Sequence, residues 1–442
     1  MVIGYTPLDP LVVLIGTALA IWFLAKAPVR LMAYLPTALS LYFFIPLFTL
    51  LTLWQTVPIL LTMRVFLQGR LKMAPSVKPI FAFAIMAFVL SATLTIIAGS
   101  DTTRAIIRII YYLGIFAMFS FCYEMGRKPD AFRLLLKGLV VLGVIYATYG
   151  FYQIVADRIG LPYRGILRGT SAGDVAYEFG FVRINSLANE PKRLGYVMFV
   201  CALACFFYVP PKESTARWMK WIGRGIFFMS LFTFSGSYLM TIVIFGAVAL
   251  LLYPSKATKF FFGAIIISAV LIVAFPEIGV IDAFQVGYER RALEIEEGID
   301  ARFVYRQEFY GWDYLNNHPL AAFFGVGIGQ YFTTLNQQYG MGVGFTEFGG
   351  LAPMNSTFLE LIFDLSGIVA VVFYLGIAAL IWKLYQAKEV FLCLALLFVT
   401  VQSFTILTLQ FMILFAGVGI ARLEQRRHVQ PEVLPQTYEL AE

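Results

Sequence analysis

LLLKGLVVLGVIYATYGFYQIV, residues 134–155, is an apolar run in which Lys137 is the one charged residue. A helix of about 20 such residues is long enough to cross the hydrocarbon core of a bilayer. Because so long an apolar run would be unfavourable in water, it predicts a membrane-spanning helix. Comparable apolar runs recur along the chain at 8–25, 31–63, 79–98, 105–123, 194–210, 225–253, 260–275, 356–382 and 389–420.

Three of these runs are long enough for two short spans each. The breaks are expected near Trp54-Gln55, at Ser235-Gly236-Ser237 and near Gln402-Ser403. With these breaks, the sequence predicts an all-α polytopic membrane protein with about 12 or 13 transmembrane helices.

The composition excludes other classes of protein. Of the 442 residues, 60% are hydrophobic and 13% are charged, whereas a soluble domain carries about 25% charged residues. Disorder requires the opposite composition, and a transmembrane β-barrel would show alternating rather than continuous apolar runs. The net charge of +7 does not indicate a nucleic-acid partner, because basic residues of membrane proteins gather in cytoplasmic loops.

The distribution of lysine and arginine over the short loops predicts the topology. It places the loops 156–193 and 276–355 together on the extracytoplasmic side and leaves open whether the N-terminus is inside or outside. The sequence divides into three sets of helices, at 1–155, 194–275 and 356–420, and a cytoplasmic tail at 421–442. The basic loop 156–193 and the second loop 276–355 separate the sets of helices.

Both long loops carry arginines that suit an anionic ligand. Loop 156–193 holds five arginines, among them Arg164, Arg183 and Arg193, against the positive-inside trend. In the second loop, segment 288–316 reads as an amphipathic helix on the membrane surface. The arginine fork matches phosphate oxygens, so Arg183 and Arg193 are candidates to bind a lipid-linked pyrophosphate together with Arg302 and Arg306 of this segment. The alternative is that these arginines pair with nearby carboxylates or lipid headgroups.

Several other polar residues are candidates for catalysis. Glu190 precedes Pro191 at the entry to a span, where it is either a base near the membrane surface or an acid that favours the helix N-terminus. His318 is either a base or a turn residue that caps backbone groups. Glu360 and Asp364 lie one turn apart near the end of a span, where acids are costly and have a functional or a structural-pair role. With two histidines and no clustered cysteines, no metal or other cofactor is expected.

Four separated stretches between residues 105 and 382 resemble the O-antigen polymerase and O-antigen ligase family of bacterial envelope glycan enzymes. They are Arg183-Ile-Asn-Ser-Leu-Ala-Asn-Glu190-Pro191, Thr233-Phe-Ser-Gly-Ser237, the block from Arg302 through His318-Pro319-Leu320 to Gly325-Val-Gly-Ile-Gly329, and Asn355-Ser-Thr-Phe-Leu-Glu360 with Gly367. The first stretch is similar to that of exopolysaccharide polymerases.

The resemblance implies a GT-C-like membrane glycosyltransferase in the bacterial inner membrane, with its active site facing the periplasm. Its donor would be an undecaprenyl-pyrophosphate-linked glycan, which is transferred with inversion and without a metal. Glu190, Arg183 and Arg302 would be catalytic. The substrate would be bound by Arg193, Arg306, Arg164, His318 and Asn355. Membrane lipid and a protein that regulates chain length are the other implied partners.

Two departures from the family pattern bear on the activity. Residues 321–324 lengthen the gap before the first glycine, and Met354 stands where the ligases carry a histidine. Met354 therefore favours a polymerase over a ligase that attaches glycan to lipid A core or protein. A polysaccharide or lipid transporter is the third interpretation, although the spans carry few charges and no internal repeat is visible.

The predicted topology can be tested by labelling single cysteines. Thr170→Cys and Ile295→Cys place a thiol in each long loop, and both should react with a membrane-impermeant maleimide in intact cells. Protection of both thiols, with labelling restored only after permeabilisation, would overturn this topology.

Overall fold

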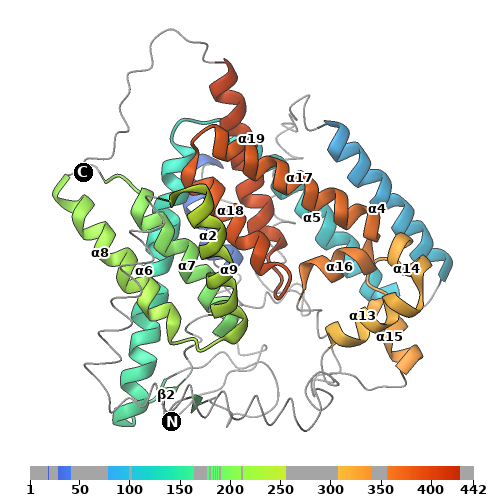
Figure 1. The fold of residues 1–442 in the computed structure, drawn as a ribbon, viewed down its shortest axis with the longest axis horizontal. Coiled ribbons are helices and arrows are strands. Elements are labelled where there is room, and N and C mark those ends of the chain that lie inside the picture. Colours follow the sequence, from blue (N-terminus) through green and yellow to red (C-terminus); the bar gives the residue numbers. More distant parts are fainter. Residues whose placement is uncertain are drawn as a thin grey trace.

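The protein is largely helical in the part of the chain that the computed structural model describes (Figure 1). Two short strands, β1 (Tyr177–Glu178) and β2 (Phe181–Val182), form an antiparallel pair. The described residues are 18, 28–40, 78–98, 102–163, 177–178, 181–182, 184, 186, 188, 191–210, 213–254, 307–339 and 356–428.

The helices fall into a long bundle and a group of short helices at one side. The bundle contains α2 (Pro28–Ser40), α4 (Lys78–Ala98), α5 (Thr102–Gly126), α6 (Ala131–Ile159), α7 (Pro191–Phe207), α8 (Glu213–Leu231), α9 (Gly236–Leu252), α17 (Gly367–Gln386), α18 (Val390–Gln402) and α19 (Leu409–His428). The short helices lie beside α4, α5 and α17 in Figure 1 and are α13 (Gln307–Asn317), α14 (Pro319–Phe324), α15 (Tyr331–Tyr339) and α16 (Thr357–Asp364).

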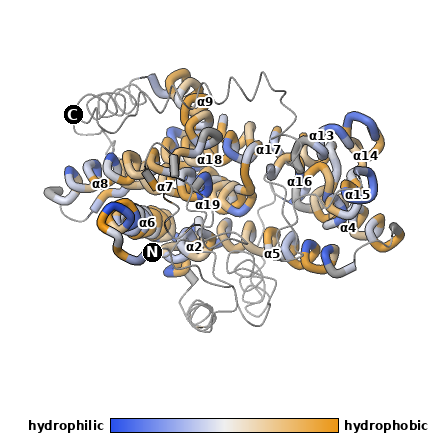
Figure 2. Tube along the Cα trace, turned by 90° about the horizontal axis from the view of Figure 1, so that it is seen from below, coloured by the Kyte–Doolittle hydropathy of each residue, from blue (hydrophilic) through white to orange (hydrophobic). Residues whose placement is uncertain are grey.

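Three of the described helices are long and apolar enough to cross a membrane. They cover Arg104–Gly126, Ala131–Ile159 and Gly367–Gln386, and shorter apolar helices occur at Ala82–Ile97, Tyr238–Leu252 and Val390–Gln402. Figure 2 shows the hydrophobic residues along these helices. The prediction of an all-helical membrane protein is confirmed at this level.

Glycines let α6 pack closely against its neighbours. A Cβ atom on Gly138 would overlap the carbonyl oxygen of Ala33 in α2. One on Gly143 would lie 2.6 Å from Cβ of Cys201 in α7. Without a strong hydrophobic drive between helices in lipid, small residues that let backbones approach are the main source of helix packing. The apolar run 134–155 therefore also supplies the surface on which α2 and α7 pack against α6.

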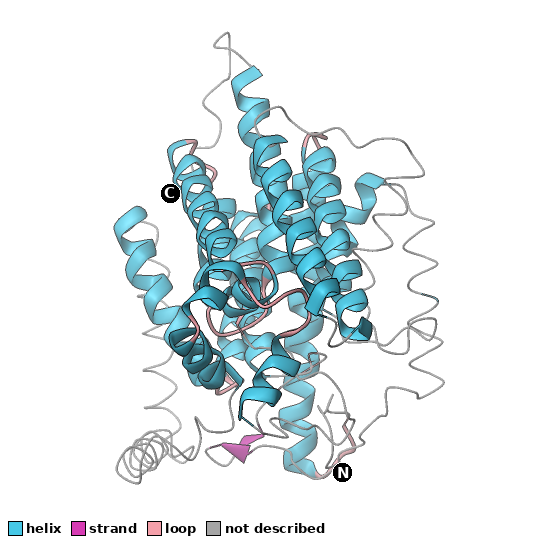
Figure 3. Cartoon of the chain, turned by 90° about the vertical axis from the view of Figure 1, so that its right-hand side faces the viewer, coloured by secondary structure: helices cyan, strands magenta, loops and turns pink. Residues whose placement is uncertain are grey.

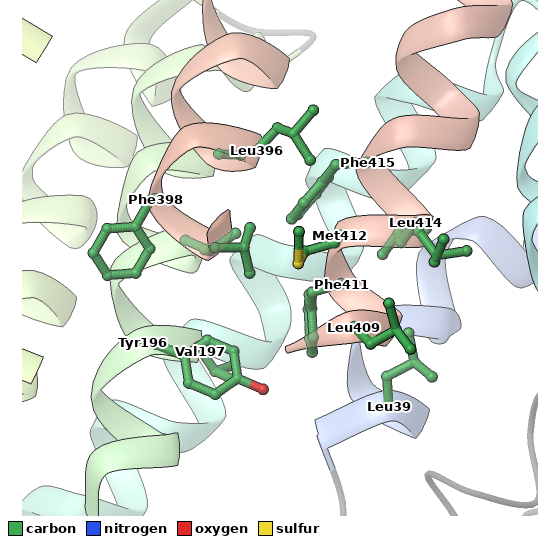
Figure 4. Close-up of a cluster of buried hydrophobic side chains, with 14 of the residues drawn as sticks. Leu39, Tyr196, Val197, Leu396, Phe398, Leu409, Phe411, Met412, Leu414 and Phe415 are labelled. Atoms are coloured by element: carbon green, nitrogen blue, oxygen red, sulfur yellow. The ribbon is translucent and has the colours of Figure 1, made fainter. Parts of the chain in front are cut away.

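Aromatic rings fill the space between α7, α9, α18 and α19. Phe199 stacks on Phe398 with 4.1 Å between ring centroids, and Phe245 meets both rings edge to face. Figure 4 shows Leu396 of α18 pointing toward Phe415 and the other apolar side chains of α19, while Phe398 lies on the opposite side of α18. All four cysteines are also buried and free, and they belong to the packed core.

Two of the predicted breaks between spans are confirmed. Helix α8 ends at Leu231 and α9 begins at Gly236, and α18 ends at Gln402 before the turn that leads to α19. The break near Trp54–Gln55 and the predicted span 260–275 lie outside the described residues, as does the predicted span 8–25 apart from residue 18.

Other predicted boundaries were wrong. Run 356–382 is two helices rather than one, because α16 ends at Asp364 and Ser366 caps α17 by accepting a hydrogen bond from the Val369 amide at 3.0 Å. Helix α19 continues past the predicted end at 420 to His428. The basic residues between 213 and 224, predicted to form a loop, belong to α8. Of the predicted surface helix 288–316, the described part begins at Gln307.

The close approach of α6 to α2 predicts a large effect of a single methyl group. Gly138→Ala should lower the free energy of unfolding by about 1–3 kcal/mol, because the clash is with backbone and α2 must move. Gly225→Ala is the matched control, since a Cβ atom there meets nothing within 4 Å. Thermal unfolding of the purified protein in detergent measures both, and equal midpoints for the two variants would contradict this packing.

Candidate functional site

A buried ion pair joins α5 to α16. The Arg108 guanidinium donates two hydrogen bonds to Oδ2 of Asp364, from Nε at 3.1 Å and from Nη2 at 2.8 Å. The hydroxyl of Tyr112 donates a third to the same oxygen at 3.0 Å. The Asp364 side chain is 0% exposed and that of Arg108 is 14% exposed. Because a buried charge is stable when it is fully paired and hydrogen-bonded, this arrangement fixes the orientation of Arg108.

The other oxygen of Asp364 holds the glycine-rich stretch that precedes α15. The Gly329 amide donates to Asp364 Oδ1 at 2.9 Å, and the Val326 amide donates to the Phe363 carbonyl at 2.9 Å. Gly325, Gly327 and Gly329 all have positive φ. A Cβ atom on Gly329 would also lie 2.9 Å from the Arg104 carbonyl oxygen. These glycines therefore form a tight turn between α14 and α15.

Glu360 is the second acid on Arg108. It forms an ion pair with Arg108 Nη2 and is 1% exposed. It lies one turn before Asp364 in α16, outside the three candidate spans. Burial raises the pKa of Glu360, and the charge of Arg108 opposes that rise. One guanidinium therefore faces two carboxylates.

Arg193 brings a second positive charge to Glu360. It lies in the first turn of α7, is 5% exposed, and interacts electrostatically with Glu360. Arg193 also lines a small pocket between α2, α7 and the start of α19. The other residues of this pocket are Leu39, Ser40, Ala188, Tyr196, Val197, Leu407 and Gln410. The site thus contains two arginines and two carboxylates and is electrically balanced.

The turn at the start of α16 sets the position of its acids. Ser356 caps the helix by accepting a hydrogen bond from the Leu359 amide at 3.3 Å. Thr357 joins the α18–α19 turn, since its amide donates to the Ser403 carbonyl at 2.8 Å and its hydroxyl oxygen accepts from the Thr408 amide at 2.9 Å. This anchoring holds Glu360 and Asp364 on the side of α16 that faces α5.

His318 occupies the junction between α13 and α14. Its ring stacks on Tyr314 with 4.2 Å between centroids, and Nδ1 lies 3.1 Å from the Tyr314 carbonyl oxygen. Its own carbonyl accepts hydrogen bonds from the amides of Ala321 and Ala322. These contacts confirm the turn role that the sequence left open, and the role of His318 as a base stays a prediction.

The other predicted site residues lie outside the described residues: Glu190, Arg183, Arg302, Arg306, Arg164 and Asn355. Three of them directly precede a described element in the chain. Glu190 precedes α7, Arg306 precedes α13, and Asn355 precedes the cap of α16.

Sequence reasoning missed Arg108. A signal was present, because Arg108 is the one charged residue of the apolar run 105–123, and an arginine within a span needs a partner. The acids one turn apart in α16 were noted without that partner. Pairing the two observations would have predicted the contact between α5 and α16.

A metal centre has no counterpart in the described residues. Within these ranges, no group of three or more His, Cys, Asp and Glu side chains is arranged to hold a metal ion.

Comparison with known proteins adds no further identification. The chain matches no protein-family model and none of the curated proteins.

The ion pair predicts a strong effect of a small substitution. Asp364→Asn keeps the size of the side chain but removes one of the two negative charges that face Arg108. It should lower the free energy of unfolding by about 3–5 kcal/mol, as breaking a buried ion pair does. Asp130→Asn is the control, because Asp130 is exposed and its side chain makes no capping hydrogen bond. Denaturation in mixed micelles with increasing SDS measures both. A wild-type value for Asp364→Asn would show that the pair does not stabilise the protein.

Proposed function

We propose that the protein is a polymerase of lipid-linked oligosaccharide units. Support comes from one observation, namely that residues of the four resembling stretches lie near one another. The Ile184 amide donates to the Phe232 carbonyl at 3.3 Å, which joins the first stretch to the residue before the second. Gly329 and Asp364 join the third to the segment of the fourth. Arg193, two residues after the first stretch, interacts electrostatically with Glu360 of the fourth.

Further contacts support the convergence of these stretches. Ser186 donates its hydroxyl to the Tyr146 carbonyl at 3.0 Å, and its amide donates to Gln153 Oε1 at 2.8 Å, so the first stretch is anchored on α6. A Cβ atom on Gly195 would lie 2.7 Å from the ring of Tyr238, which follows the second stretch. Figure 3 shows the side of the molecule on which α13, α14 and α15 lie in Figure 1, with the strand pair at the lower end.

The proposed reaction transfers a glycan between two lipid carriers. The acceptor hydroxyl oxygen attacks the anomeric carbon of the donor glycan, and the bond between that carbon and the pyrophosphate oxygen breaks with inversion. The electron pair leaves with undecaprenyl pyrophosphate, and the hydroxyl proton passes to a base, for which Glu190 is the first candidate. Arg183 and Arg302, with Arg193 and Arg306, would stabilise the charge that develops on the pyrophosphate.

Chain-length profiles of surface glycan test the proposal in the producing bacterium. Deletion of the gene should abolish long polymer and retain single repeat units. Loss of attachment with polymer still on its lipid carrier would instead indicate a ligase. Loss of every glycan from the outer face of the membrane would indicate a transporter. Either of these last two results would contradict the proposal.

The roles of single residues follow from the same assay. Glu190→Gln removes the proposed base and should reduce polymerisation about 10²–10⁴-fold at a normal protein level. Glu178→Gln, which removes another carboxylate from the same loop, should leave polymer length unchanged. A normal rate in Glu190→Gln together with loss of activity in His318→Ala would move the base to His318. Arg302→Lys keeps the charge but loses the bidentate fork, and should weaken use of the donor.

A further inference from the structure

Helix α8 has two different halves. Its C-terminal half is buried in the bundle, where Ile226, Phe227 and Met229 belong to the core. Its N-terminal half presents a row of exposed residues that contains three basic side chains and two tryptophans, namely Arg217, Trp218, Lys220, Trp221 and Arg224. In Figures 1 and 2, α8 lies at the edge of the bundle. We call these five residues the basic tryptophan face.

The tryptophans of this face are largely outside the protein core. Trp218 is 69% exposed and Trp221 is 61% exposed. The Arg224 guanidinium lies 4.5 Å from the centre of the Trp221 ring, a distance at which a cation interacts with the ring. After Glu213, no acidic residue occurs in α8. The face therefore combines exposed indole rings with uncompensated charge along one helix.

This combination matches the boundary between lipid tails and headgroups. Tryptophan is enriched there because its ring is apolar and its N–H group is polar. Lysine and arginine at the same depth extend their charged ends toward the headgroups. An arginine fork that rests on an indole keeps its N–H groups directed at phosphate oxygens. An acidic protein surface would match the charge of this face but would leave the two indole rings without an apolar partner.

We propose that the basic tryptophan face binds the headgroups of anionic phospholipids. The ligand class is a phosphodiester lipid with a net negative charge, such as phosphatidylglycerol or cardiolipin, and the ligand is a component of the surrounding bilayer. Arg217, Lys220 and Arg224 contact the headgroup phosphates, and Trp218 and Trp221 lie against the glycerol and upper acyl regions. This site is independent of the proposed polymerase activity, because it rests on α8 alone.

Native mass spectrometry of the full-length protein in detergent tests the proposal, with phosphatidylglycerol and phosphatidylcholine as probes. Wild-type protein should retain phosphatidylglycerol more tightly than phosphatidylcholine. Each basic residue close to an anionic surface contributes about five-fold to binding, so the triple variant Arg217→Gln/Lys220→Gln/Arg224→Gln should lose on the order of 100-fold in phosphatidylglycerol affinity. Its affinity for phosphatidylcholine should not change.

A second triple variant controls for the loss of net charge. Lys128→Gln/Lys137→Gln/Lys383→Gln removes three exposed charges from other helices and loops, and should keep the preference for phosphatidylglycerol. The variant Trp218→Phe/Trp221→Phe assigns fluorescence to these two tryptophans. Brominated phosphatidylglycerol should quench the part of the wild-type fluorescence that this variant lacks. Equal affinity of the wild type for both lipids would overturn the proposal. So would an equal loss in the two triple variants, or the absence of quenching at these tryptophans.

Discussion

The contact of Arg108 with Asp364 and Glu360 is the interaction on which the rest of the described site depends. It places one guanidinium and two carboxylates in an environment where an unpaired charge would be costly. Both carboxylate oxygens of Asp364 are hydrogen-bonded as a consequence. Asp364 uses one oxygen for Arg108 and Tyr112 and the other for the Gly329 amide. Residues from α5, α16 and the glycine turn are thereby fixed relative to one another.

The same contact explains why the glycine turn needs its glycines. Gly329 must approach both Asp364 and the backbone of α5, and Gly327 lies where a Cβ atom would be 2.6 Å from Thr95 Oγ1 of α4. These approaches require positive φ values, which glycine adopts without a steric penalty. Charge pairing and backbone geometry are therefore two parts of one constraint at the junction of α4, α5 and α16.

The described site supplies buried charges for the proposed function. Arg193 contributes a fixed positive charge at the start of α7, and Glu360 connects it electrostatically to Arg108. A site that stabilises a pyrophosphate leaving group needs charges that do not move during the reaction. Burial of both arginines and their pairing with acids of α16 provide that rigidity.

Much of the architecture was predictable from the sequence, because the length and continuity of the apolar runs determine which segments can cross a bilayer. The breaks at Ser235–Ser237 and at Gln402 were also predictable, because serine and glycine interrupt apolar runs there. The end of α16 at Asp364 was not, because the apolar run continues through this position and the break depends on Ser366, which caps α17. Arg193 was a candidate because of its charge, whereas its connection to Arg108 through Glu360 needed three-dimensional contacts between residues far apart in the chain.

The coupling between Arg108 and Asp364 tests the central claim most directly. A double-mutant cycle with Arg108→Met, Asp364→Leu and the double variant measures it through the free energy of unfolding in mixed micelles. If the two side chains form the ion pair that organises the site, the double variant should lose less stability than the sum of the single variants, with a coupling energy of about 0.5–3 kcal/mol. Additive effects, within about 0.5 kcal/mol, would contradict the account.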